Sequence, residues 1–241
     1  MTSYLLFRLY GPLAAWGEMA VGEMRPTAAW PGKSAIVGML GAALGVRRDE
    51  ETVHKEMSES YGVAVCVERQ GELIRDYHTA QVPPKRRGRV YRTRRDELES
   101  DVLHTILSQR DYRMDALYYV ALWCRSDSPP YSLERLRDAL CKPVFCLYLG
   151  RKSCPPSLPL QPQVRDEESL FDAFDRVRFS GEWLLDTLPQ ENERLFVWEE
   201  HDSPGLQAMH VARRRDQVLS RKRWQFSDRD EYHCSLAVKE E

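Results

Sequence analysis

Alternating hydrophobic and polar residues mark several short stretches of the chain, and this pattern predicts β-strands. In residues 4–10 the apolar side chains of Leu5, Phe7 and Leu9 fall on one face, and a Gly-Pro pair ends the stretch. Apolar runs bounded by turn residues predict further strands at 62–69, 72–79, 114–123 and 144–149, and in the last third at 193–198 and 232–238.

Two stretches have the spacing of an amphipathic helix. The first spans about 33–44, with Ser34 as a candidate N-terminal cap, and the second spans 132–141 and stops at a Lys-Pro pair. Gly38 and Gly41 lie inside the first helix, where each costs about 1 kcal/mol relative to alanine. We interpret them as points of close packing of this helix on a sheet, in preference to a ligand site.

The elements run in the order strand, helix, strand, strand, insertion, strand, helix, strand. With one hairpin leg discounted, this is the βαββαβ order of a ferredoxin-like α+β fold, which RNA-recognition modules also use. A proline-rich stretch at 154–162 marks a boundary. We therefore expect a palm domain at 1–155, with an insertion at about 80–113, and a smaller, irregular β-rich region at 156–241.

The insertion carries a run of cations with no acid among them: Lys85, Arg86, Arg87, Arg89, Arg92, Arg94 and Arg95, with Tyr91 inside the run. The formal net charge is only -2, so the distribution of charge is more informative than its sum. Structureless loops of this length are uncommon unless functional or disordered, although a solvated loop is the plain alternative. Folded as a hairpin, the insertion would project and could lie along a nucleic-acid strand. A second basic cluster, at 213–215 and 221–223, is left open between RNA and a protein partner.

Two shorter segments offer phosphate contacts. Gly32-Lys33-Ser34 resembles the end of a P-loop, but Thr27 stands where that motif needs glycine, which argues against nucleotide hydrolysis. The start of a helix with a lysine and a serine remains a good seat for an RNA phosphate. Arg151, Lys152 and Ser153 follow the strand expected at 144–149, and a charged loop without function is an equal alternative.

The composition limits which classes of protein fit this sequence. No run of about 18 apolar residues is present and the N-terminus lacks a basic signal region, so we expect a cytoplasmic protein with no membrane association. The six cysteines form no C-x-x-C pair, so we expect buried reduced thiols, no metal and no cofactor. Tyr77 and His78 are weak candidates for metal-independent RNA cleavage, but a structural histidine is the preferred interpretation.

Several motifs together resemble the Cas-five family of CRISPR-associated proteins from type I-E Cascade complexes. They occur in order over the first 155 residues, and the last third matches only weakly near 228–232. The matching segments are residues 4–13 with Trp16-Gly17, 25–27, 31–34, 38–45 with Arg48-Asp49, 76–79, 120–123, and the most specific block, 142–155.

This resemblance implies a non-catalytic RNA-binding subunit for antiviral and anti-plasmid defence. Such subunits combine an RNA-recognition-like palm with a projecting β-hairpin thumb, and they bind the 5′ handle of the CRISPR RNA. The implied partners are the neighbouring backbone subunit, reached through the thumb, and the large target-reading subunit, so that target DNA would be met only indirectly. A type I-C relative cleaves RNA, but its Lys-His pairing is not evident here. The alternatives are a metal-independent endoribonuclease that processes repeat RNA, and a scaffold whose basic loop meets an acidic protein.

The residues expected to contact RNA combine the three basic segments with aromatic side chains that could stack on bases. They are Arg25, Lys33, Ser34, Tyr77, His78, Lys85, Arg86, Arg87, Arg89, Arg92, Arg94, Tyr148, Arg151, Lys152 and Ser153, with Trp30 as a further candidate.

Overall fold

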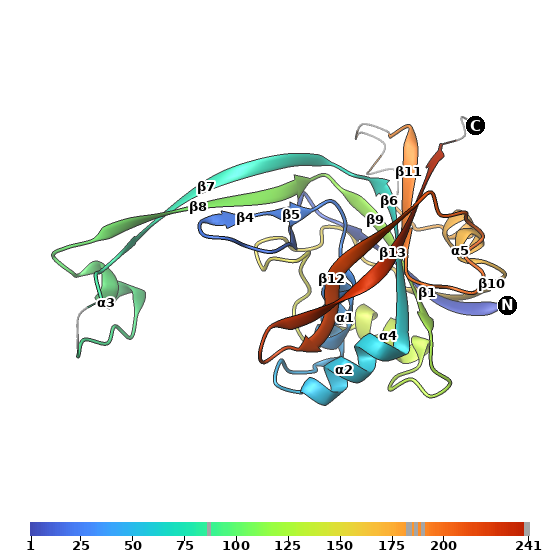
Figure 1. The fold of residues 1–241 in the computed structure, drawn as a ribbon, viewed down its shortest axis with the longest axis horizontal. Helices are drawn as coiled ribbons and strands as arrows, with labels where there is room; N and C mark the ends of the chain where they lie inside the picture. Colours follow the sequence, from blue (N-terminus) through green and yellow to red (C-terminus); the bar gives the residue numbers. More distant parts are fainter. Residues whose placement is uncertain (86–87, 182–184, 186–187, 189–190, 239–241) are drawn as a thin grey trace.

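A seven-stranded antiparallel sheet forms the centre of the computed structural model, which describes residues 1–85, 88–181, 185, 188 and 191–238 (Figure 1). The strand order is β10-β1-β9-β6-β11-β13-β12. The strands are β1 (Thr2–Tyr10), β6 (Tyr61–Arg69), β9 (Leu117–Cys124), β10 (Gln163–Glu167), β11 (Glu193–Trp198), β12 (His210–Ser220) and β13 (Gln225–Ala237).

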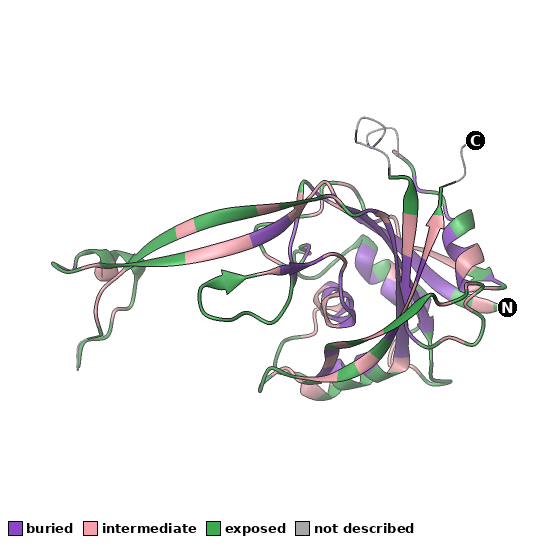
Figure 2. Ribbon diagram, turned by 45° about the horizontal axis from the view of Figure 1, so that its top comes forward, coloured by how far each residue is buried: buried purple, intermediate pink, exposed green. Residues whose placement is uncertain are grey.

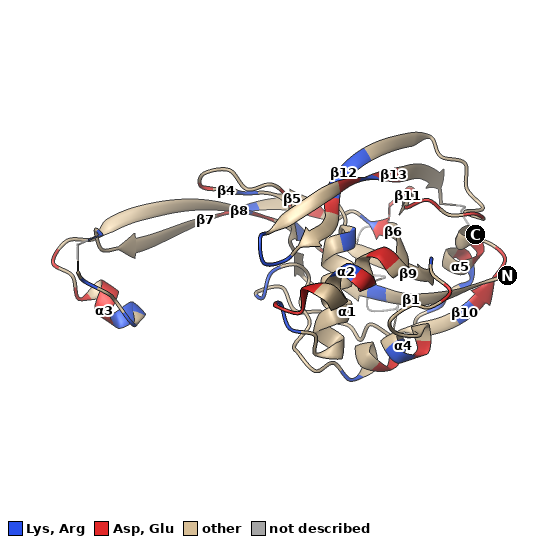
Figure 3. Ribbon diagram, turned by 60° about the horizontal axis from the view of Figure 1, so that its bottom comes forward, with Lys and Arg blue, Asp and Glu red and all other residues tan. Residues whose placement is uncertain are grey.

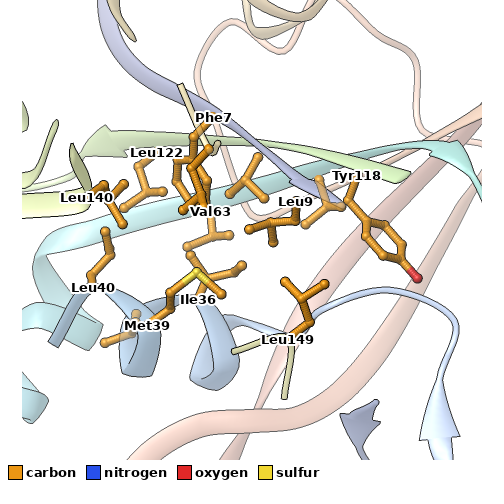
Figure 4. Packing of buried hydrophobic residues seen from close by; sticks show 14 of the residues in the cluster. Phe7, Leu9, Ile36, Met39, Leu40, Val63, Tyr118, Leu122, Leu140 and Leu149 are labelled. Atoms are coloured by element: carbon orange, nitrogen blue, oxygen red, sulfur yellow. The ribbon is translucent and has the colours of Figure 1, made fainter. Parts of the chain in front are cut away.

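Helices cover both faces of this sheet. Helices α1 (Lys33–Leu44) and α4 (Leu133–Cys141) pack on the face that carries Leu5 and Phe7, and the close-up in Figure 4 shows side chains of both helices against β1, β6 and β9. Helix α5 (Leu170–Arg176) packs on the opposite face, against Tyr4 and Leu6. Strand β1 is therefore buried on both faces, whereas its alternation predicted burial of one face only.

The mixed α+β class with antiparallel sheets is confirmed, but the strand predicted at 144–149 is wrong. The amides of Val144 and Phe145 donate to the carbonyls of Ala43 and Ala42, at 3.0 and 3.1 Å, so this segment caps the C-terminal end of α1. Strand β10 pairs with β1 beside β9 instead. The boundary expected at residue 155 thus falls between strands of one continuous sheet.

A long two-stranded ribbon extends away from the sheet (Figure 1). It consists of β7 (Glu72–Val82) and β8 (His104–Met114), with the short helix α3 (Arg94–Leu98) beyond its end. Figure 2 shows that the outer ribbon is largely exposed and that burial begins towards its base. The base is widened by β2 (Leu13–Ala14) and β4 (Met24–Arg25), while β3 (Trp16–Gly17) pairs with β5 (Thr27–Ala28).

Helix α2 (Glu51–Ser60) was not predicted, because its sequence is mostly polar. It buries His54, Met57 and Ser58, and its packing explains one glycine of α1. An added Cβ at Gly41 would lie 3.2 Å from the ring of His54, and one at Gly38 would lie 2.9 Å from Arg221. The glycines therefore admit side chains of α2 and of the β12–β13 turn, not the sheet as predicted.

The N-terminus of α1 also differs from expectation. Its cap is Gly32, which supplies no side-chain bond, and Ser34 lies inside the helix. In the described part of the chain, no helix is long and apolar enough to cross a membrane.

Candidate nucleic-acid interface

A groove of about 2020 Å³ runs between α1, the segment after α4 and the β12–β13 hairpin. Helix α1 contributes Ser34 and Gly38, the segment after α4 contributes Tyr148 and Lys152, and the hairpin contributes its arginines and Trp224. The groove therefore joins parts of the chain that are distant in sequence.

Arginines on the strands of this hairpin are neutralised by acids of the chain. Arg213 lies 3.7 Å from Asp230, and Arg215 lies 3.1 Å from Asp228, each on the neighbouring strand. Arg214 lies between Asp216 and Glu231, at 3.5 and 3.3 Å. These cations contribute less free charge to the groove than their number suggests.

The helix start expected to bind a phosphate is occupied by a carboxylate of the chain itself. The backbone amide of Lys33 donates to Asp216 Oδ2 at 2.7 Å, and the Lys33 ammonium lies 2.9 Å from Glu199 with both side chains buried. Burial lowers the pKa of Lys33, and Glu199 opposes that effect. Arg229 holds Asp216 through two hydrogen bonds of 2.6 and 3.0 Å. Lys33 is thus committed to internal partners, and the expected phosphate seat is corrected to an internal ion-pair network.

Four cations along the groove have no carboxylate within ion-pair distance among the described residues. They are Arg47, Arg48, Lys152 and Arg221. Arg221 donates to the carbonyl of Ser34 at 2.9 Å, and burial, with Arg48 nearby, lowers the pKa of its guanidinium. Arg48 lies 4.4 Å from the ring centre of Trp224. Unneutralised cations beside an exposed aromatic ring suit the phosphates and bases of a single-stranded nucleic acid.

The expected RNA contacts of the 150–153 loop are divided between structure and surface. Arg151 donates to the carbonyls of Asp111 and Arg25, at 3.1 and 2.8 Å, and lies over the ring of Tyr112, so it fixes this loop to the ribbon base. Lys152 is exposed and lines the groove. The hydroxyl of Ser153 contacts the neighbouring Cys154 thiol at 3.8 Å.

Arg25 lies next to this loop, in strand β4 at the ribbon base, where its carbonyl accepts the hydrogen bond from Arg151. Its guanidinium donates to the carbonyls of Gly22 and Met24, at 2.7 and 2.9 Å, and remains exposed. Trp30 donates to Glu231 at 3.2 Å, which ties it to the ion-pair network.

The ribbon and the segment around α3 carry the remaining expected residues, and Figure 3 shows that the ribbon extends away from the elements that line the groove. Tyr77 is 61% exposed and accepts a hydrogen bond from Gln109 at 2.7 Å, while His78 Nε2 lies 2.6 Å from Asp76. Because Tyr77 and His78 are consecutive in β7, their side chains point to opposite faces and do not converge.

Beyond the strands of the ribbon, exposed cations cluster around α3. Lys85, Arg89, Arg92 and Arg94 are exposed there, with Arg94 bonded to Glu97 at 2.6 Å; Arg86 and Arg87 lie outside the described residues. The expected cations thus occupy two separate places, the groove and the far end of the ribbon.

The groove residues Arg47, Arg48, Arg221 and Trp224 were missed as individual site candidates. The basic cluster at 221–223 was noted but could not be oriented. The only local signal for a site was the Trp that follows it. Within the described ranges, no group of three or more His, Cys, Asp or Glu side chains is placed to hold a metal ion.

Comparison with known proteins identifies the class to which this fold and groove belong. A family model described as "CRISPR-associated protein (Cas_Cas5)" matches residues 4–230. The chain therefore belongs to the Cas5 family of CRISPR-associated proteins.

Individual relatives agree with this family. The chain is 38% identical, over 161 residues, to the CRISPR system Cascade subunit CasD of Escherichia coli (strain K12), and the match covers 66% of this chain and 70% of that protein. A chain from a structure of a CRISPR RNA-guided surveillance complex is similar with a TM-score of 0.62 and 25% identity, over 98% of this chain and 90% of that one. A crystal structure of a Cas protein is similar with a TM-score of 0.57 and 25% identity, over 97% and 94% of the two chains.

Proposed function

We propose that the chain is a non-catalytic subunit of a CRISPR Cascade surveillance complex and holds the 5′ handle of the guide RNA. The observation that carries the proposal is the groove, because it gathers four cations without carboxylate partners among the described residues, together with exposed Tyr148 and Trp224. Phosphate contacts would position the handle, and base contacts would read it. The E. coli relative is a Cascade subunit by name, which supports the same assignment.

In this proposal the ribbon is a thumb and the sheet with α1 and α4 is an RNA-recognition-like palm. The far end of the ribbon, with the segment around α3, exposes Leu98, Val102 and Ile106, at 45%, 47% and 47%, next to the cations there. Exposed apolar residues among charges suit contact with a protein and with RNA together. We assign this end of the ribbon to the neighbouring backbone subunit, and the large target-reading subunit docks on the body nearby.

Binding of RNA by the purified chain tests the proposal. At fixed salt, repeat-derived RNA should bind more tightly than a scrambled RNA of equal length, measured by fluorescence anisotropy. Arg47→Gln combined with Lys152→Gln should weaken binding of both RNAs. Lys55→Gln is the matched control, because Lys55 is exposed on α2 and paired with Glu59. If the wild-type chain binds the repeat-derived and the scrambled RNA with equal affinity, the proposed recognition of the handle is refuted.

The alternative, a metal-independent endoribonuclease, is tested in the same preparation. Tyr77 and His78 do not converge, and His78 lies beside Asp76 on its own face of β7, which favours a binding role for this region. Incubation of repeat RNA with the chain in a chelator should leave the RNA intact. Cleavage at one position of the repeat, abolished by His78→Ala with binding retained, would replace the non-catalytic assignment.

A further inference from the structure

The turn between β12 and β13 presents an exposed tryptophan in an unusual backbone conformation. Trp224 is 56% exposed and has a φ of 56°, in the left-handed region that bulky residues rarely occupy. Phe226 packs against it at an interplanar angle of 83°. A residue that is both exposed and conformationally costly is more simply explained by a contact outside the chain than by packing within it.

Two arginines lie against this ring, and neither is paired with a carboxylate among the described residues. The guanidinium of Arg48 lies 4.4 Å from the ring centre and that of Arg221 lies 5.8 Å from it. Neither has a carboxylate within ion-pair distance among the described residues, and Arg221 Nε is buried without a hydrogen-bond partner. Arg213 and Arg215 are paired with acids across the same hairpin, so Arg48 and Arg221 are better placed to bind an anion, although Asp49, Glu50 and Glu51 line the hollow beside the turn.

Two hollows of the surface meet at the same three side chains. The groove already described is one, and a second hollow of about 910 Å³ lies between the start of α2 and the turn. Arg48, Arg221 and Trp224 line both. A chain molecule that occupies both hollows would therefore lie against this ring.

We propose that Trp224 is a stacking platform for one unpaired base of bound RNA, with Arg48 and Arg221 holding the phosphates on either side. The site takes a single strand, because a base in a duplex has no free face to offer. It deepens the proposed function and rests on it, since it requires that RNA enter the groove. An acidic peptide would use the two guanidiniums but would not need the ring.

Two probes of equal length separate stacking from charge: a single-stranded RNA, and the same ribose-phosphate chain without bases. Trp224→Ala in the full chain should weaken binding of the RNA by about 5-fold to 100-fold and leave the abasic chain unchanged. Trp224→Phe, which keeps a π-face, should retain most of the affinity. Arg48→Gln with Arg221→Gln should weaken both probes, while Arg137→Gln, an exposed arginine of α4 paired with its neighbour Asp138, should weaken neither.

The outcomes separate this inference from the function on which it rests. If the wild-type chain binds neither probe, RNA binding itself fails. If the wild-type chain binds RNA but Trp224→Ala has no effect, or weakens both probes equally, the stacking platform is refuted and RNA binding stands. Thermal unfolding of each variant checks the fold, and the Phe variant tests the ring if the Ala variant is unstable.

Discussion

Gly62 in β6 shows how tightly a single position is constrained in this core. A Cβ added there would lie 2.1 Å from the ring of Trp123, which is buried on the paired strand. We predict that Gly62→Ala destabilises the protein by about 1–3 kcal/mol, because the ring has no free space into which to move. Urea unfolding measures the change.

Gly17→Ala is the control, since nothing lies within 4 Å of its added Cβ, and it should change stability by less than about 0.5 kcal/mol. Equal effects of the two substitutions would contradict the packing argument.

The role of a charged residue depends on what the fold places opposite it, and here the sequence was least informative. Lys33 was interpreted as a phosphate ligand from its place at the start of a predicted helix. The helix is present, but Glu199 and Asp216 take the ammonium and the amide. Neither partner lies within 160 residues of Lys33 in the sequence, and no periodicity reveals such a contact. The residue type indicated that Lys33 would bind a negatively charged group. Only the tertiary fold decides whether that group belongs to a ligand or to the chain itself.

At the scale of elements, the β12–β13 hairpin is fixed to α1 by a buried ion-pair network, and this makes its attachment sensitive to pH. Burial alone would raise the pKa of Glu231, but the hydrogen bond to His233 and the charges of Arg214 and Arg229 outweigh it and lower that pKa to about 2. A carboxylate with a lowered pKa stabilises the fold above its unfolded pKa, near 4.5, and this stabilisation disappears as the pH falls towards 2.

We predict that Glu231 contributes about 3 kcal/mol at neutral pH, lost progressively between about pH 4.5 and 2. Urea midpoints measured over this range should fall steeply for the wild-type chain. Glu231→Gln should be less stable at pH 7 and show a flatter decline. Asp228→Asn, which alters an exposed acid paired with Arg215, should follow the wild-type curve. An unchanged slope in Glu231→Gln would show that other carboxylates dominate acid unfolding.

The ribbon β7–β8 is a second element whose independence can be tested. Helix α3 buries none of its own residues, and Val82 pairs directly with His104. We predict that replacing residues 83–103 by Asn-Gly, a favoured two-residue hairpin turn, shifts the melting temperature by less than about 4 °C. Calorimetry of the shortened chain measures this. A larger loss would mean that the end of the ribbon stabilises the body.

Helices and strands were predicted correctly where the local sequence pattern determines them. The predictions failed where contacts with other parts of the chain determine the structure. The apolar run at 193–198 predicted the bounds of β11, and the apolar stripe at 33–44 predicted those of α1. The apolar run at 144–149 has the same strand pattern, but the open carbonyls at the end of α1 take its amides. β12, with three consecutive arginines, has no strand pattern in the sequence, and it forms by pairing along its length with β13, whose acids lie opposite its arginines.

At the scale of the whole molecule, the near-neutral net charge conceals two separate clusters of cations, one around α3, where Figure 3 shows basic and acidic residues together, and one along the groove. The ribbon lies between these clusters, and several cations of the body, among them Lys33, Arg214 and Arg229, are held in internal ion pairs. If the chain binds RNA as proposed, its near-neutral net charge makes long-range attraction of RNA weak, and affinity depends mainly on the unpaired cations of the groove. The proposed function therefore predicts a preference for RNA that fits the groove over nucleic acid in general.

The salt dependence of RNA binding counts those free cations. If Arg47, Arg48, Lys152 and Arg221 each contact one phosphate, the log–log slope of affinity against salt should be about -2.8, since each contact on a single strand contributes about -0.7. Lys152→Gln should reduce the magnitude of the slope by about 0.7, and Lys55→Gln should leave it unchanged. Anisotropy titrations from low to moderate salt provide both values. A slope near zero would mean that RNA binds without contacts between its phosphates and these four cations. A much steeper slope would mean that the cations around α3 contact the same RNA molecule. The distance of α3 from the groove argues against that second outcome in the isolated chain.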